Sequence, residues 1–84
     1  MRFHKKNWLD AVVEKLLRDG FRPNGLAAIR LESSFQRKRV IVEIRGGRTL
    51  RVLKGGTEYI HPNCSLAKAI EIVNAAAIAA DFSE

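Results

Sequence analysis

With 84 residues, 46% of them hydrophobic and 29% charged, the chain has the composition of one small folded domain, and a disordered or low-complexity segment is excluded. Its net charge of +6 favours a polyanion or an acidic protein surface as partner. No apolar run approaches the roughly 18 residues that a membrane span needs, so we expect no membrane partner.

We expect one domain over residues 1–84, with residues 1–6 as a flexible basic arm and residues 81–84 as a tail. The first residues lack the hydrophobic stretch of a signal peptide. The single cysteine, Cys64, has no internal disulfide partner, which agrees with a reducing compartment. Both observations favour a cytoplasmic protein.

The first predicted element is a helix over residues 8–19. Hydrophobic residues from Trp8 to Leu17 recur at the spacing of one helix face, with charged residues on the other face. Asn7 can cap the first turn, and Gly20 suits the left-handed position that follows the last turn. Both ends of this helix are therefore well signalled.

Alternating apolar and polar residues in the middle of the chain predict strands. The three predicted strands cover residues 26–33, 39–45 and 49–53. Directly opposite side chains in an antiparallel pair share a face, so apolar residues should meet apolar ones. In the second hairpin Ile44 then pairs with Leu50, and Glu43 pairs with Arg51. The glycines of residues 46–48 suit the three-residue turn that this register requires.

For the first hairpin, the same reasoning pairs Leu31 with Val40. The turn then falls on residues 34–37. This register places Phe35 at the hairpin tip, where an aromatic ring could stack or wedge against a partner.

Residues 57–61 are compatible with either a short strand or a loop, and a second helix is predicted over residues 65–80, capped by Asn63 or Ser65. Its apolar end is either an alanine surface close on the sheet or a homodimer contact. The homodimer contact would use Ala75, Ala76, Ile78 and Ala79. Together the elements predict an α+β domain of order αβββα, a three-stranded antiparallel meander with two helices packed on one face.

His61 and Cys64 are the strongest candidates for catalysis or metal binding, since they lie three positions apart just before a predicted helix. They could form a nucleophile with its base, or half a metal site. A nucleophile needs an oriented base and an oxyanion site, and a structural zinc needs four ligands. The other histidine, His4, lies in the predicted arm, so we expect no enzyme, no metal and no cofactor.

Basic residues concentrate in residues 37–54, which hold seven of the fifteen lysines and arginines and one acid, Glu43. A solvated sheet face is one interpretation, but the lack of compensating acids favours a phosphate-binding surface. The predicted register leaves Arg37 and Lys38 unpaired at one turn and Arg48 unpaired at the other. The candidate binding residues are Arg30, Phe35, Arg37, Lys38, Arg39, Arg45, Arg48, Arg51, Lys54 and Lys68.

A helix, a three-strand antiparallel meander and an alanine-rich second helix follow one another over residues 7–80. The alanine-rich stretches are residues 67–69 and 75–77. This order resembles the double-stranded RNA-binding domain, a family that contacts RNA through helix one, the first hairpin loop and lysines at the start of helix two. The resemblance implies the hairpin-loop role for Arg37 and Lys38. It implies the lysine role for Lys68, which is the one cation in that stretch.

Two functions follow from these patterns. The first is a non-enzymatic nucleic-acid-binding protein, for DNA or RNA, which contacts phosphates through a basic sheet and its hairpin tips. The second is a small inhibitor or regulator that binds a host protein, either at an acidic surface through the same basic face or through the apolar end of the second helix. Short, basic, single-domain chains of this character are similar to phage inhibitors such as anti-CRISPR proteins. An apolar pair, Ile41 and Leu53, inside the basic face would suit such a partner.

Overall fold

The structure is a computed structural model that describes residues 7–24 and 34–83. The strand predicted over residues 26–33, which includes Arg30, lies outside the described residues, as does the predicted arm at residues 1–6.

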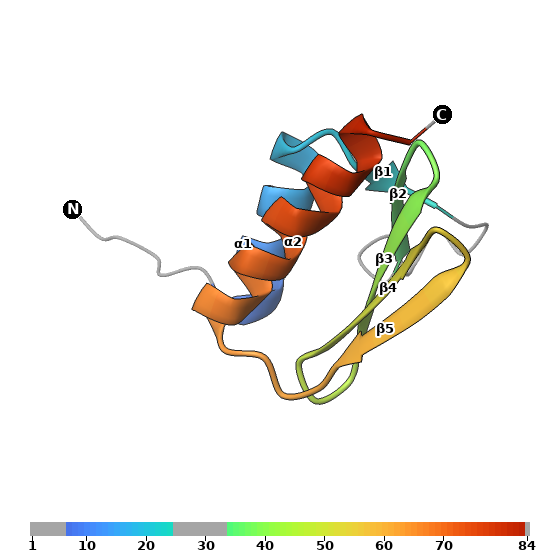
Figure 1. Ribbon diagram of the computed structural model, residues 1–84. Helices are drawn as coiled ribbons and strands as arrows, with labels where there is room; N and C mark the ends of the chain where they lie inside the picture. Colours follow the sequence, from blue (N-terminus) through green and yellow to red (C-terminus); the bar gives the residue numbers. More distant parts are fainter. Residues whose placement is uncertain (1–6, 25–33, 84) are drawn as a thin grey trace.

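Two helices and five strands make up the described part of the chain (Figure 1). In chain order they are α1 (Trp8–Arg18), β1 (Arg22–Pro23), β2 (Ser34–Arg37), β3 (Val40–Arg45), β4 (Thr49–Lys54), β5 (Thr57–His61) and α2 (Leu66–Asp81). The strands form one antiparallel sheet in the order β1-β2-β3-β4-β5. The predicted α+β class is confirmed, and the predicted count of three strands is wrong because short strands add to both sides of the meander.

The ends of α1 follow the predicted signals. The Asn7 side chain accepts a hydrogen bond from the Asp10 backbone N–H at 2.7 Å, which satisfies one of the unpaired donors of the first turn. Gly20 has a φ of +94°, a left-handed conformation that glycine adopts without strain. The Phe21 N–H then donates back to the Leu16 carbonyl at 2.9 Å, and the Phe21 side chain is buried.

The predicted register of the second hairpin is confirmed. Ile44 lies opposite Leu50 and Glu43 lies opposite Arg51, with residues 46–48 as the turn. Three independent signals agree in this hairpin: apolar residues share a face, opposite charges meet across the strands, and glycine supplies the left-handed turn conformation.

The predicted register of the first hairpin is wrong. Phe35 lies opposite Val42, and Arg37 lies opposite Val40, so the turn is the dipeptide Lys38-Arg39. Phe35 is therefore not at the hairpin tip; its side chain is 1% exposed in the core. The observed register still buries both valines, and it adds a large aromatic side chain to the buried face.

Residues 57–61, which the sequence predicted as either a short strand or a loop, form the strand β5. It follows the two-residue turn of Gly55 and Gly56, which have φ values of +58° and +76° and so suit a tight hairpin turn. Tyr59 lies opposite Val52, and among the described residues no strand pairs with the other long side of β5. β5 is thus an edge strand, and its residues 57–60 are exposed.

A single cluster of buried residues joins both helices to the sheet. Its members are Val12 and Leu16 of α1, Phe21, then Phe35, Val40, Val42, Leu50 and Val52 of the strands, then Cys64, and Ala69, Ile72, Val73, Ala76 and Ala80 of α2. Because alternate residues of a strand share a face, the buried strand residues lie on one face of the sheet, here called the inner face. Figure 1 shows α1 and α2 side by side, with α2 running along the sheet.

Candidate functional site

The face of the sheet opposite the inner face, here called the outer face, carries an ion-pair network across three strands. Arg51 of β4 donates to Glu43 of β3 at 2.8 Å and also pairs with Glu58 of β5. Arg45 donates to the same Glu43 carboxylate at 2.8 Å. Two arginines predicted to bind phosphates are therefore already matched by carboxylates of the same sheet.

The network changes the acidity of its members. Partial burial by itself raises the pKa of Glu43, but hydrogen bonds from Arg45 and Arg51 outweigh it and bring the pKa below its ordinary value of 4.5. Hydrogen bonds to Glu43 and Glu58 raise the pKa of Arg51. Both shifts favour the charged forms, so the network stays ionised at neutral pH.

A group with a lowered pKa stabilises the fold above its unfolded pKa and loses that contribution as the pH falls through the folded value. Glu43→Gln should therefore lower the free energy of unfolding at about pH 7 by about 0.5–1 kcal/mol, because it removes charged hydrogen-bond partners. The same variant should lose less stability than the wild type between about pH 5 and pH 3. Urea unfolding at both ends of that range measures this difference.

Glu71→Gln is the matched control, because Glu71 is 74% exposed and lies 3.7 Å from Lys68 within one helix. Its free energy of unfolding at about pH 7 should stay within about 0.5 kcal/mol of the wild type. Equal acid sensitivity of the Glu43 variant and the wild type would contradict the stabilising role of the network.

Arg37 links the end of β2 to α2 and is not at a hairpin tip. Its guanidinium donates to the Ala77 carbonyl at 3.3 Å and pairs with Asp81, both near the C-terminal end of α2. The C-terminal end of a helix carries a partial negative charge, so an arginine is a favourable neighbour there. The side chain is 27% exposed, which limits what it can offer to a partner.

Arg48 and Lys68 lie toward the opposite end of the sheet from the Lys38-Arg39 turn. The Arg48 guanidinium lies over the ring of Trp8, 6.0 Å from the ring centre, and its carbonyl accepts a hydrogen bond from the Cys64 N–H. Lys68 forms an ion pair with Glu71 of the same helix, with its Nζ 3.7 Å from the carboxylate. Arg48, in the turn between β3 and β4, is separated from the Lys38-Arg39 turn by the length of β3.

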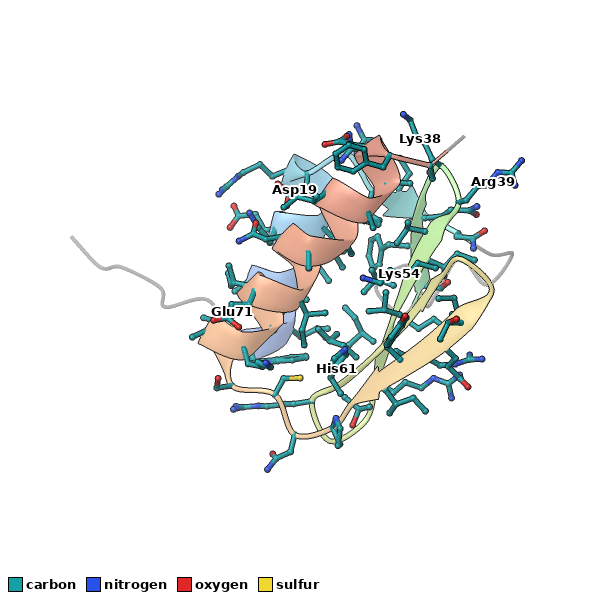
Figure 2. The ribbon with its side chains drawn as sticks, viewed as in Figure 1. Asp19, Lys38, Arg39, Lys54, His61 and Glu71 are labelled. Atoms are coloured by element: carbon teal, nitrogen blue, oxygen red, sulfur yellow. The ribbon has the colours of Figure 1, made fainter. Side chains whose placement is uncertain are left out.

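Three cations gather at the Lys38-Arg39 end of the sheet. Lys38 and Arg39 form the turn between β2 and β3, and Lys54 ends β4, which runs antiparallel to β3. Figure 2 shows the Lys38 and Arg39 side chains extending into solvent from their turn. Within the described ranges no carboxylate pairs with Lys38, Arg39 or Lys54. We call these three residues the basic end.

The basic end borders a cleft between the β4–β5 hairpin and the C-terminal part of α2, here called the terminal cleft. Its volume is about 590 Å³. Its lining residues are Arg39, Val40, Lys54, Gly55, Thr57, Tyr59, Ala79, Phe82 and Ser83. Two of the three cations of the basic end thus line the same hollow as two aromatic residues, Tyr59 and Phe82.

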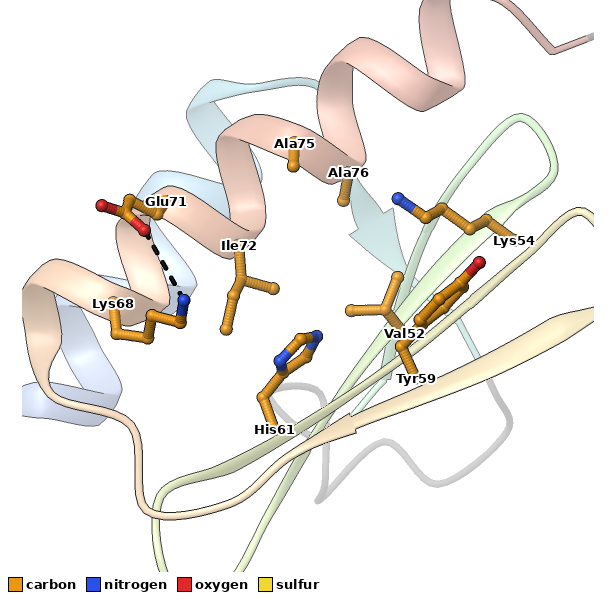
Figure 3. A pocket seen from close by; sticks show the side chains of 9 residues that line it. All are labelled: Val52, Lys54, Tyr59, His61, Lys68, Glu71, Ile72, Ala75 and Ala76. Carbon is orange, nitrogen blue, oxygen red and sulfur yellow. Dashed lines mark ion pairs between the residues drawn. The ribbon is translucent and has the colours of Figure 1, made fainter.

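A second cleft, here called the central cleft, shares Lys54 and Tyr59 with the terminal cleft and extends along α2 (Figure 3). Its volume is about 250 Å³. It is lined by Val52, Lys54, Tyr59, His61, Lys68, Glu71, Ile72, Ala75 and Ala76. Figure 3 shows Tyr59 and His61 on the sheet side and the small side chains of Ala75 and Ala76 on the α2 side.

Both exposed aromatic residues of the terminal cleft were missed by the sequence analysis, which gave the stacking role to Phe35. Tyr59 is 41% exposed and Phe82 is 82% exposed. The Lys54 ammonium lies over the Tyr59 ring, 5.2 Å from its centre. Tyr59 could have been found from the strand-like pattern of residues 57–61, whereas Phe82 follows the last residue of α2 and has no periodic signal.

No protein-family model, curated protein or solved structure matches the chain. The resemblance to the double-stranded RNA-binding domain therefore stays a prediction. No helix within residues 7–24 or 34–83 is long and apolar enough to cross a membrane.

The His61–Cys64 pair is not arranged as a nucleophile with its base. The Cys64 thiol is buried and donates to the His61 backbone carbonyl at 3.1 Å, whereas the imidazole lines the central cleft. In the described part of the chain, no group of three or more His, Cys, Asp and Glu residues could hold a metal ion.

The predicted homodimer contact is only partly exposed. Ala76 is buried in the core and Ala79 packs against it. Ala75 and Ile78 are exposed, and Ile78 retains 58% of its accessible surface. The small side chains of Ala76 and Ala80 bring this end of α2 close to the sheet.

Proposed function

We propose that this chain is a non-enzymatic nucleic-acid-binding module that contacts phosphates through its basic end. The observation that carries the proposal is the gathering of Lys38, Arg39 and Lys54, none matched by a described carboxylate, beside a cleft. Unmatched lysines and arginines are what a phosphate backbone binds, since they release counterions without first breaking an ion pair. Such contacts carry no sequence information, so the proposed binding is not sequence-specific.

The basic end is a better phosphate site than the outer face. On the outer face a phosphate would have to displace Glu43 or Glu58 from Arg51 and Arg45. We infer that both helices cover the inner face, as predicted, because residues of both belong to one buried cluster with the inner-face side chains. Neither described helix then covers the outer face, and its arginines Arg45 and Arg51 are matched by carboxylates, whereas the three described cations of the basic end are not.

Salt dependence tests the proposal through two matched double variants. Three phosphate contacts on a single strand predict a slope of log Kobs against log salt of about −2. Lys38→Gln/Arg39→Gln removes two of the contacts and should bring the slope to about −0.7. Fluorescence anisotropy with labelled oligonucleotides from about 50 to 200 mM salt measures the slope.

Arg45→Gln/Arg48→Gln is the matched control, because it removes the same charge from around the opposite turn. This control should keep the wild-type slope. Equal losses in the two double variants would show that net charge alone drives binding, and absence of any binding by micromolar protein at low salt would overturn the proposed function.

A protein-binding inhibitor is the second candidate, and the side chain of Ile60 favours it. Ile60 lies on the outer face of the edge strand β5. Its large apolar side chain is 58% exposed, so the described residues leave more than half of it open to solvent. A protein partner that uses this position would be lost on Ile60→Lys and retained by Lys38→Gln/Arg39→Gln. Nucleic-acid binding through the basic end gives the opposite result.

A further inference from the structure

We propose that the terminal cleft takes a single-stranded nucleic acid whose bases stack on Tyr59 and Phe82 while the basic end holds the adjoining phosphates. This inference rests on the proposed function and names its ligand class. It concerns the same site, but it depends on the aromatic residues and on the shape of the cleft, which phosphate binding alone does not require.

The first argument is the exposure of the two aromatic side chains. Phe82 is 82% exposed and Tyr59 is 41% exposed, although burial of a phenyl or phenol ring is among the larger gains available to a small domain. They come from opposite walls of the terminal cleft, Tyr59 from β5 and Phe82 from the end of α2. A cleft with an aromatic ring on each wall can bind a ligand with flat, apolar faces by stacking.

The second argument is that cations and aromatic rings line the same cleft. Arg39 and Lys54 line the terminal cleft together with the two rings. Proteins that bind single strands combine a basic groove, which follows the backbone, with aromatic side chains on which successive bases stack. The Lys54 ammonium over the Tyr59 ring brings a cation and a stacking surface together, 5.2 Å apart.

The third argument is the space between the walls. The α2 wall presents Ala79 to the terminal cleft and Ala75 and Ala76 to the central cleft, so small side chains leave room beside the rings. The two clefts have volumes of about 590 and 250 Å³ and share Tyr59. In a duplex the base faces are stacked inside the helix, so only unpaired bases can reach rings in a cleft. The arrangement therefore favours a single strand over a duplex.

The test measures binding of labelled single-stranded DNA, single-stranded RNA and the matching duplexes, each of about 16 nucleotides, by fluorescence anisotropy. Tyr59→Ala and Phe82→Ala should each weaken single-strand binding about fivefold or more. The salt slope should stay at the wild-type value in both variants, because stacking releases no counterions. Phe82→Trp should restore binding, since indole also stacks.

Two control variants keep the test specific. Ile60→Ala changes an exposed side chain of β5, and Ile78→Ala changes one of α2; both are 58% exposed and neither lines the terminal cleft. Neither control should alter single-strand affinity. Tyr59 and Phe82 are themselves exposed, so their variants should keep the wild-type circular dichroism and melting temperature.

The proposal is supported if the protein binds single-stranded DNA or single-stranded RNA more tightly than the matching duplex, and if Tyr59→Ala and Phe82→Ala both weaken this binding. Equal affinity for single strand and duplex, or aromatic variants that bind as the wild type does, overturns stacking while leaving phosphate binding by the basic end intact. Absence of binding to any of the four oligonucleotides overturns the proposed function as well. An acidic peptide that competes as strongly as the single strand would show that the cleft selects charge and not bases.

Discussion

Replacing Phe35 with alanine is expected to lower the free energy of unfolding by about 3–5 kcal/mol. The side chain is 1% exposed and packs in the core between the sheet and the helices. A chain of 84 residues has a total stability of only about 4–12 kcal/mol, so this variant should be largely unfolded at modest urea concentrations. Urea titration followed by circular dichroism measures the loss.

Phe82→Ala is the matched control for Phe35→Ala, because it removes the same atoms from a side chain that is 82% exposed. Its stability should stay within about 0.5 kcal/mol of the wild type. Equal stability of the two variants would contradict the observed register of the first hairpin and would favour a register with Phe35 at the tip.

Arg37→Ala is expected to lower the free energy of unfolding by about 1–2 kcal/mol, the second largest effect on stability. The variant leaves the Ala77 carbonyl and the Asp81 carboxylate without their guanidinium partner, and both lie at the end of α2 where negative charge is unfavourable. For a chain of this size the loss corresponds to a fall in Tm of about 4–8 °C for each kcal/mol. Calorimetry measures the shift.

The neighbouring Arg39 provides the control for Arg37. It lies two positions from Arg37, in the turn between β2 and β3, and no described carboxylate pairs with it, so Arg39→Ala should leave the Tm within about 2 °C of the wild-type value. Arg37→Lys should fall between the two, because an ammonium cannot reach two acceptors in the fixed geometry of a guanidinium. Equal Tm values for the Arg37 and Arg39 alanine variants would refute the stabilising role of Arg37.

The two hairpins show why strand registers differ in how well a sequence determines them. In the second hairpin, the facing charges of Glu43 and Arg51 and the turn glycines exclude registers that the alternation alone would allow. In the first hairpin, Val40 and Val42 stay on the inner face after any shift of an even number of residues. Matching apolar residues favoured Leu31 as the partner of Val40, but the observed register places Arg37 there and buries Phe35 opposite Val42.

The candidate site was harder to predict because it depends on which charges find a partner. Arg37 meets Asp81, 44 positions away in the chain, and no local pattern indicates such a contact. Arg51 meets Glu58 only because residues 57–61 form a strand beside β4. Composition located the excess of cations, but the fold determines that Lys38, Arg39 and Lys54, which have no carboxylate partner among the described residues, lie together at one end of the sheet.

The buried thiol of Cys64 gives this fold an intrinsic reporter. Cys64 is the chain's single cysteine, is 3% exposed, and lies where β5 passes into α2. Its N–H donates to the Arg48 carbonyl and its thiol to the His61 carbonyl, so a reagent reaches the sulfur only when this junction opens. The rate of thiol modification thus records the opening of the β5–α2 junction in the native chain, without an introduced label.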